Sequence, residues 1–130
     1  MKILILVARI LLGLAFLIFG LNKIVTFIHM PMPTGDAGAV MILMFAHGWL
    51  RMVGTAEAAC GLLLLTGRFV PLALTVLAAI GLNILFFGFA FAPSGIYLPL
   101  FLAILEVILV FAYREYFRGI FTSKATPMWR

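Results

Sequence analysis

The sequence predicts an all-α integral membrane protein, a single-domain four-helix bundle, and three observations support this prediction. Hydrophobic residues make up 66% of the 130 residues and charged residues only 10%. A soluble domain averages about 45–50% apolar and about 25% charged residues, so lipid must solvate most of this surface. The hydrophobic residues also fall into four long runs separated by short turns, at about 3–21, 48–66, 69–91 and 96–117.

The net charge of +5 does not indicate a nucleic-acid-binding protein. The basic residues are dispersed at the ends of the apolar runs and do not cluster on a polar face, a pattern typical of a membrane topology signal. The single cysteine, Cys60, excludes an intrachain disulfide and a CxxC redox pair. We interpret Cys60 as a small packing residue.

The first run, 3–21, is predicted to be a retained membrane helix and not a signal peptide. Lys2 would suit the charged start of a signal peptide, but Arg9 interrupts the apolar run and no A-x-A-like cleavage site follows. Helical spacing places two charges and two small residues on one face of this helix. These residues, with the aromatic between them, are Arg9, Gly13, Phe16, Gly20 and Lys23.

A short amphiphilic element is predicted between the first two spans. Pro31 and Pro33 forbid continuation of the first helix. Residues Ala37–His47 are apolar but too few to cross a bilayer. We therefore expect an interfacial or re-entrant helix there.

Polar residues near the midpoints of the later spans predict a buried site. Glu57, Asn83 and Glu106 each lie near the middle of a span, and Arg9 lies about two turns inside the first. A charge stranded in lipid costs a few kcal/mol, roughly 2.5–3.5 on insertion scales, so the four side chains are expected to face one another. One arginine and two glutamates in the same site leave an excess of negative charge. We therefore expect one of the two carboxyl groups to be protonated at neutral pH, and we expect it to be Glu106 in preference to Glu57.

The distribution of basic residues predicts that both termini are cytoplasmic. The N-terminus, the turn at Arg68 and the basic tail 118–130 would share that side. The longer first loop would then face outward. Its polar neighbours form a predicted outer entrance to the bundle, consisting of Lys23, His47 and Arg51.

The sequence contains no motif for metal binding or nucleophilic catalysis. His29 and His47 belong to the outward segment, and neither is part of a CxxCH or HExxH motif. No GxSxG elbow is present. We predict no metal site and no covalently bound cofactor.

Three segments resemble the DoxX family of small four-helix membrane proteins. They are Arg9-Ile-Leu-Leu-Gly-Leu-Ala-Phe-Leu-Ile-Phe-Gly with Asn22-Lys23, then Glu57-Ala-Ala-Cys-Gly-Leu-Leu-Leu-Leu-Thr-Gly-Arg68, and Asn83-Ile-Leu-Phe-Phe. The likeness extends over about Val7 to Phe121, although the first loop is longer than in the most compact members. It implies Arg9, Glu57 and Asn83 in a polar centre, and a subunit of a quinone-linked membrane oxidoreductase.

Three functions remain open at this point. The first is an accessory or quinone-interacting subunit, in which Glu57 or Glu106 exchanges a proton and quinone is the candidate ligand. The second is a non-catalytic assembly subunit, and the third is a small-solute or proton-coupled transporter. The expected partners are the lipid bilayer and other membrane subunits or a second copy, in a bacterial or archaeal cytoplasmic membrane, with no nucleic acid.

Overall fold

The computed structural model describes residues 1–25, 34–91 and 96–128. The predicted turns at Pro31 and Pro33 and at Pro93, and His29, lie outside the described residues. All regular structure within these ranges is helical, as predicted. Its elements are α1 (Lys2–Ile24), α2 (Gly35–Ala46), α3 (Trp49–Thr66), α4 (Val70–Phe91), α5 (Tyr97–Ala112) and the 3-10 helix η2 (Arg114–Phe121).

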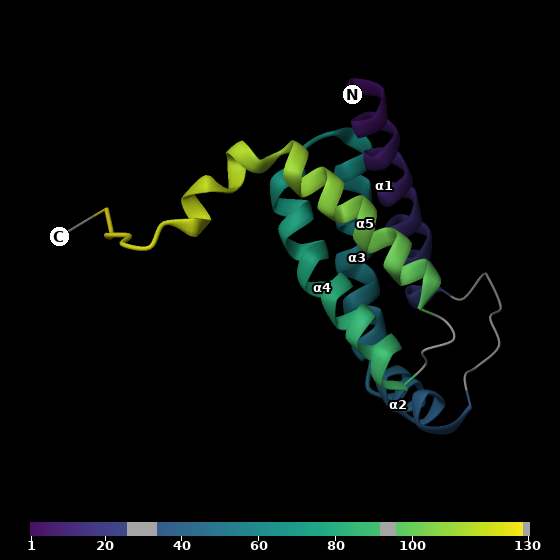
Figure 1. Cartoon of the computed structure of the whole chain (residues 1–130). Coiled ribbons are helices and arrows are strands. Elements are labelled where there is room, and N and C mark those ends of the chain that lie inside the picture. Colours follow the sequence, from purple (N-terminus) through teal and green to yellow (C-terminus); the bar gives the residue numbers. More distant parts are fainter. Residues whose placement is uncertain (26–33, 92–95, 129–130) are drawn as a thin grey trace.

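The long helices pack in a closed order around an aliphatic core. Helix α1 contacts α3 and α5, and α4 also contacts α3 and α5, whereas α2 touches the beginning of α3. The N-terminus, the α3–α4 turn and the end of α5 lie at one end of the molecule, and α2 lies at the other (Figure 1). The largest apolar side chains that are fully buried in this core are Leu12, Leu64, Leu74, Leu77 and Leu109.

Three of the described helices, α1, α3 and α4, are long and apolar enough to cross a membrane. They contain 23, 18 and 22 residues, and they match three of the predicted spans within a few residues. Many of their apolar side chains point outward, as a lipid solvent requires. The chain is therefore a membrane protein with three or four helices of membrane-spanning character.

The predicted fourth span, 96–117, was wrong as one straight helix. Helix α5 ends at Ala112 after 16 residues, and η2 leaves it at an angle of 84°. Sixteen helical residues extend about 24 Å, less than the roughly 30 Å of a hydrocarbon core. The bend lies at Tyr113, directly before the sequence becomes charged at Arg114 and Glu115.

The short helix predicted before the second span is present as α2. It has 12 residues and ends at Ala46. Gly48 then takes a left-handed conformation with φ of 74°, and this separates α2 from α3. A helix of this length is too short to span a bilayer alone. It lies at the end of the molecule opposite to η2 (Figure 1).

The tight turn from α3 to α4 is a Schellman motif. Gly67 has φ of 74°, its N–H donates to the Leu64 carbonyl, and the Arg68 N–H donates to the Leu63 carbonyl. These bonds satisfy the last carbonyl groups of α3, and glycine adopts the left-handed conformation without steric cost. Pro71 then lies in the first turn of α4, where its missing N–H is tolerated.

Candidate functional site

Glycines bring the backbones of α1 and α3 into direct contact. A Cβ atom built on Gly20 would lie 2.5 Å from the Gly54 carbonyl oxygen, and one on Gly54 would lie 2.6 Å from the Gly20 oxygen. A second contact pairs Gly13 with Gly61, where an added Cβ on Gly61 would lie 2.6 Å from the Gly13 oxygen. The predicted glycine faces of both helices are therefore confirmed as a packing surface, of the small-residue kind that membrane helices use.

This contact surface places an ion pair inside the molecule. The Lys23 ammonium of α1 donates to Oε1 of Glu57 on α3, forming a salt bridge. The Glu57 side chain is 1% exposed and that of Lys23 is 26% exposed. A Cβ on Gly54 would lie 2.7 Å from the Lys23 Cβ, so glycine at this position leaves room for the lysine stem to reach back to the carboxylate.

The structure does not bring Arg9 into contact with this pair. Its guanidinium lies against Gly67, at the carboxyl end of α3, where an added Cβ would overlap it. A cation is favoured there because the aligned peptide dipoles of a helix give its carboxyl end negative partial charge. Lys23, and not Arg9, neutralises Glu57, which corrects the predicted Arg9–Glu57 association.

Asn83 also lies apart from the predicted cluster. Its side chain is exposed on α4, and its amide donates to the Ala79 carbonyl of the same helix at 3.0 Å. The expected convergence of Arg9, Glu57, Asn83 and Glu106 at one centre is therefore not what the structure shows. Two of the four, the glutamates, remain inside the molecule.

Glu106 is half-buried, and its carboxyl group has no partner in the described structure. Both of its carboxyl oxygens are shielded, and neither has a hydrogen-bond partner among the residues that the structure describes. The side chain instead lines a cavity of about 260 Å³ between α4 and α5. The rest of the lining is apolar and includes Phe16 of α1, Gly81 and Leu85 of α4, and Leu102 of α5.

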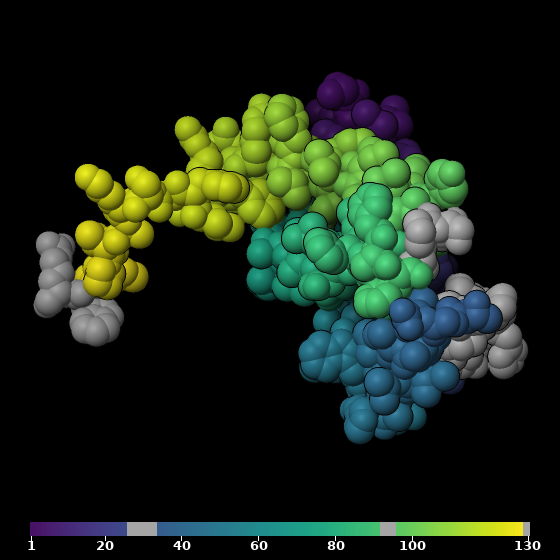
Figure 2. Space-filling model, turned by 60° about the horizontal axis from the view of Figure 1, so that its bottom comes forward, coloured from purple at the N-terminus to yellow at the C-terminus, as the bar shows by residue number. Residues whose placement is uncertain are grey.

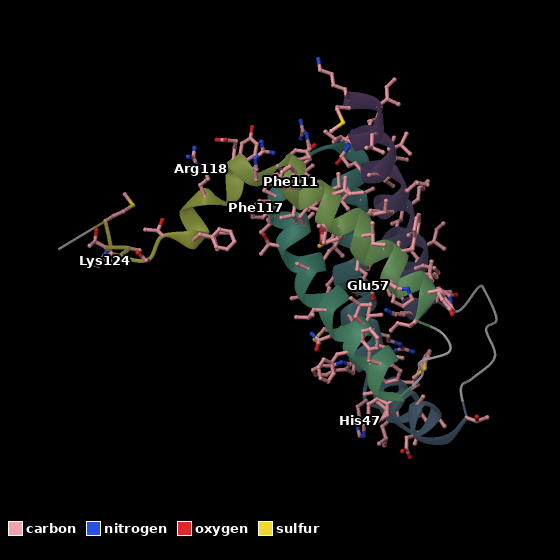
Figure 3. All side chains as sticks on the ribbon, viewed as in Figure 1. His47, Glu57, Phe111, Phe117, Arg118 and Lys124 are labelled. Carbon is pink, nitrogen blue, oxygen red and sulfur yellow. The ribbon has the colours of Figure 1, made fainter. Side chains whose placement is uncertain are left out.

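Cys60 lies between the two acidic positions in the described interior only as a packing residue. Its thiol is buried on α3 one turn after Glu57. The interior thus contains a paired carboxylate on the α1–α3 side and an unpaired carboxyl on the α4–α5 side. Figure 3 shows Glu57 within the helix bundle, well away from both ends of the chain.

Of the three residues predicted to form an outer entrance, only His47 and Arg51 lie together at the surface. His47 and Arg51 are exposed near the junction of α2 and α3, at the end of the molecule where α2 lies (Figure 3). Lys23 is turned inward to Glu57 and does not join them. In the described part of the chain, no group of three histidine, cysteine or acidic side chains is arranged to hold a metal ion.

Sequence reasoning missed the role of Lys23, although a signal for it exists. Gly20 precedes Lys23 by three residues, and Gly54 precedes Glu57 by three. Once Gly20 and Gly54 are paired across two antiparallel helices, the long lysine side chain is the nearest cation to the carboxylate. The cavity beside Glu106 had no comparable signal, because it depends on how α4 and α5 diverge.

The helices and the buried acidic groups define a small integral membrane protein with a polar interior. The family model for DoxX matches residues 4–92. The chain belongs to the DoxX family, as its glycine, lysine and glutamate pattern indicated. No curated protein and no solved structure matches the chain.

Proposed function

We propose that this DoxX protein is a membrane subunit of a redox assembly that binds the head group of a quinone in the cavity between α4 and α5. The observation that supports the proposal most strongly is the Glu106 carboxyl, buried and unpartnered at the wall of an apolar cavity. A buried polar group without a partner is costly, and such groups in membrane helices usually mark functional sites. A ligand with a hydrogen-bonding head and an apolar body would satisfy both features.

The cavity suits such a ligand in size and in access. Its volume of about 260 Å³ is close to the lower end of small-molecule pockets, roughly 300 Å³. It would therefore accommodate a ring but not a long isoprenoid tail. Leu82 and Val107 line the cavity and are exposed on the surface that faces lipid, so the tail can remain in the bilayer.

Glu106 would act as a neutral carboxylic acid. The described structure gives it no cation, whereas Glu57 has Lys23, and an isolated carboxylate in an apolar setting is strongly disfavoured. A neutral acid can donate a hydrogen bond to a carbonyl oxygen and can release or accept one proton. A bound quinone would supply the electron-carrying chemistry that the side chains of this chain lack, with electrons delivered by a partner subunit.

A photoreactive quinone tests this proposal in bilayer vesicles containing the full chain. We expect crosslinks on α4 and α5 that unlabelled quinone suppresses. Ala103→Trp should abolish them by filling the cavity, and Glu106→Leu should weaken them by removing the donor. Glu57→Gln is the matched control and should leave them intact. Crosslinking that survives Ala103→Trp would contradict the proposed site.

A second candidate is a structural subunit of a larger membrane complex, and Asn83 favours it. Its amide is exposed on α4 near the middle of a membrane-capable helix. Polar side chains at such positions hydrogen-bond across helices, so a helix of another subunit could satisfy it. In this case Asn83→Leu should release the chain from its complex during purification, while Glu106→Gln should have no effect on assembly or on activity of the complex.

We also propose that the end of the molecule where α1 begins and α5 ends is cytoplasmic. Lys2 at the start of α1, Arg68 in the α3–α4 turn and Arg118 in η2, just after α5, are all exposed. An excess of basic residues near the ends of spans marks the cytoplasmic side. A reporter fused to either terminus should be active only in the cytoplasm, and an external signal from either fusion would contradict this orientation.

A further inference from the structure

A second cavity adjoins the first and is lined by Ala78 of α4 and by α5 from Glu106 to Arg114. Its volume is about 350 Å³, and it is more open than the first. Between its two polar ends the walls are apolar and consist of Ala78, Val107, Val110 and Phe111. The lining of this groove is therefore apolar in its middle, with a carboxyl group at one end and a cation at the other.

Arg114 is fixed at the mouth of this groove. Its guanidinium lies 4.5 Å from the centre of the Phe111 ring, and its Nη1 donates to the Phe111 carbonyl at 2.9 Å. The carbonyl bond uses one of the five N–H donors of the guanidinium. The stacked geometry therefore presents a preorganised, planar donor group where the groove meets the end of α5.

The chain beyond Arg114 adds positive charge at the same level. Because η2 leaves α5 at 84°, it does not extend the bundle but projects sideways from it (Figure 1). Arg118 and Lys124 are exposed along this segment, which projects from the body of the molecule (Figures 2 and 3). The one acidic residue of η2, Glu115, is paired with Arg118 at 3.2 Å.

We propose that this groove binds an anionic phospholipid, with one acyl chain along Val107 and Val110 and the phosphate on Arg114 and Arg118. The apolar walls match the acyl chain, and the guanidinium groups match the phosphate, to which arginine donates in a bidentate manner. Because η2 turns away from the apolar helix α5 and carries charged residues, we place it along the membrane surface, at the depth of the lipid head groups. The groove shares Ala78, Glu106 and Val107 with the first cavity, but Val110, Phe111 and Arg114 line only the groove, and the phosphate contact proposed here uses this separate part.

Native mass spectrometry of the full chain tests the proposal directly. The purified protein would be exposed to equal amounts of dioleoyl phosphatidylglycerol and dioleoyl phosphatidylcholine, which share their acyl chains. We expect preferential retention of phosphatidylglycerol, and we expect Arg114→Gln to lower it about fivefold, since a basic residue near the membrane surface contributes about that factor. Arg51→Gln, which removes an exposed cation at the opposite end, is the matched control and should leave it unchanged.

Two further arms separate a lipid site from a simple anion site. Val110→Trp fills the groove without changing charge, so it should lower retention of both lipids, and excess inorganic phosphate should not displace phosphatidylglycerol. Equal retention of the two lipids would overturn the proposal, and so would equal effects of Arg114→Gln and Arg51→Gln. Displacement by phosphate, with no effect of Val110→Trp, would reduce the site to surface anion binding. Circular dichroism identifies a misfolded variant, in which case Arg118→Gln replaces Arg114→Gln.

Discussion

The two sides of the helix bundle treat a buried glutamate in opposite ways. On one side, α1 and α3 touch through glycine backbones, and Glu57 forms a salt bridge with Lys23 beside this contact. On the other side, α4 and α5 separate around a cavity, and Glu106 has no partner in the described structure. The comparison teaches that depth in a span does not by itself identify a functional carboxyl. What distinguishes the two glutamates is whether the protein itself satisfies the charge.

The largest expected effect comes from Lys23→Met. It leaves the Glu57 carboxylate unpaired in the interior, and breaking a buried ion pair costs about 3–5 kcal/mol. We expect a loss near the lower limit, about 3 kcal/mol in the free energy of unfolding in detergent, because Lys23 is partly exposed. The double variant Lys23→Met with Glu57→Met should recover most of the loss. A single variant as stable as the parent chain would show that the pair is not structural.

The next effect tests the glycine contact that supports this pair. Gly20→Ala places a methyl group 2.5 Å from the Gly54 oxygen, so the helices must separate. Overpacking of this kind costs about 1–3 kcal/mol, measurable as a lower midpoint of thermal unfolding. Gly81→Ala in α4 is the control, because its added Cβ meets nothing within 4 Å. Similar behaviour of the two variants would contradict a close α1–α3 contact.

Much of the α1–α3 side could be predicted from the sequence, and little of the α4–α5 side could. Regularly spaced glycines and a mid-span glutamate are local patterns, and helical periodicity alone places Gly54, Glu57 and Gly61 on one face. The partner of Glu57 was misassigned, because periodicity does not specify which helices meet or how far a lysine stem can reach. Arg9 satisfied the same pattern but lies at the end of α3, where the helix terminus attracts it.

The cavity and the bend after α5 depend on tertiary packing. No residue type in α4 or α5 indicates where the two helices diverge, so the cavity beside Glu106 could not be predicted from the sequence. The hydrophobic run 96–117 continues through Tyr113 and Phe117, and composition alone therefore extends the span past its true end at Ala112. Tyr116 lies within the predicted span but is 72% exposed, because it follows the bend.

A single substitution applied to both glutamates sharpens the contrast further. Glu57→Gln removes the charge that binds Lys23, and we expect a loss of about 1.5 kcal/mol in unfolding free energy, the lower limit for a hydrogen bond to a charged group, because Lys23 is partly exposed. Glu106→Gln exchanges one unpartnered polar group for another of the same size, so the change should be below about 0.5 kcal/mol. Chemical denaturation in mixed micelles measures both. A larger loss for Glu106→Gln would indicate a hidden structural partner.

Glu106→Gln, the variant with the smallest expected effect on stability, gives the most specific test of which glutamate is protonated. If Glu106 is neutral and Glu57 is ionised, infrared spectra of protein with carboxyl-labelled glutamate should contain a protonated carboxyl band at neutral pH. Glu106→Gln should remove this band, whereas Glu57→Gln should leave it, because Lys23 keeps Glu57 ionised. Addition of a quinone should shift the band through the hydrogen bond proposed above. Two ionised carboxylates at neutral pH would contradict the asymmetry, since an ionised Glu106 would require a cation beside a cavity wall that is otherwise apolar.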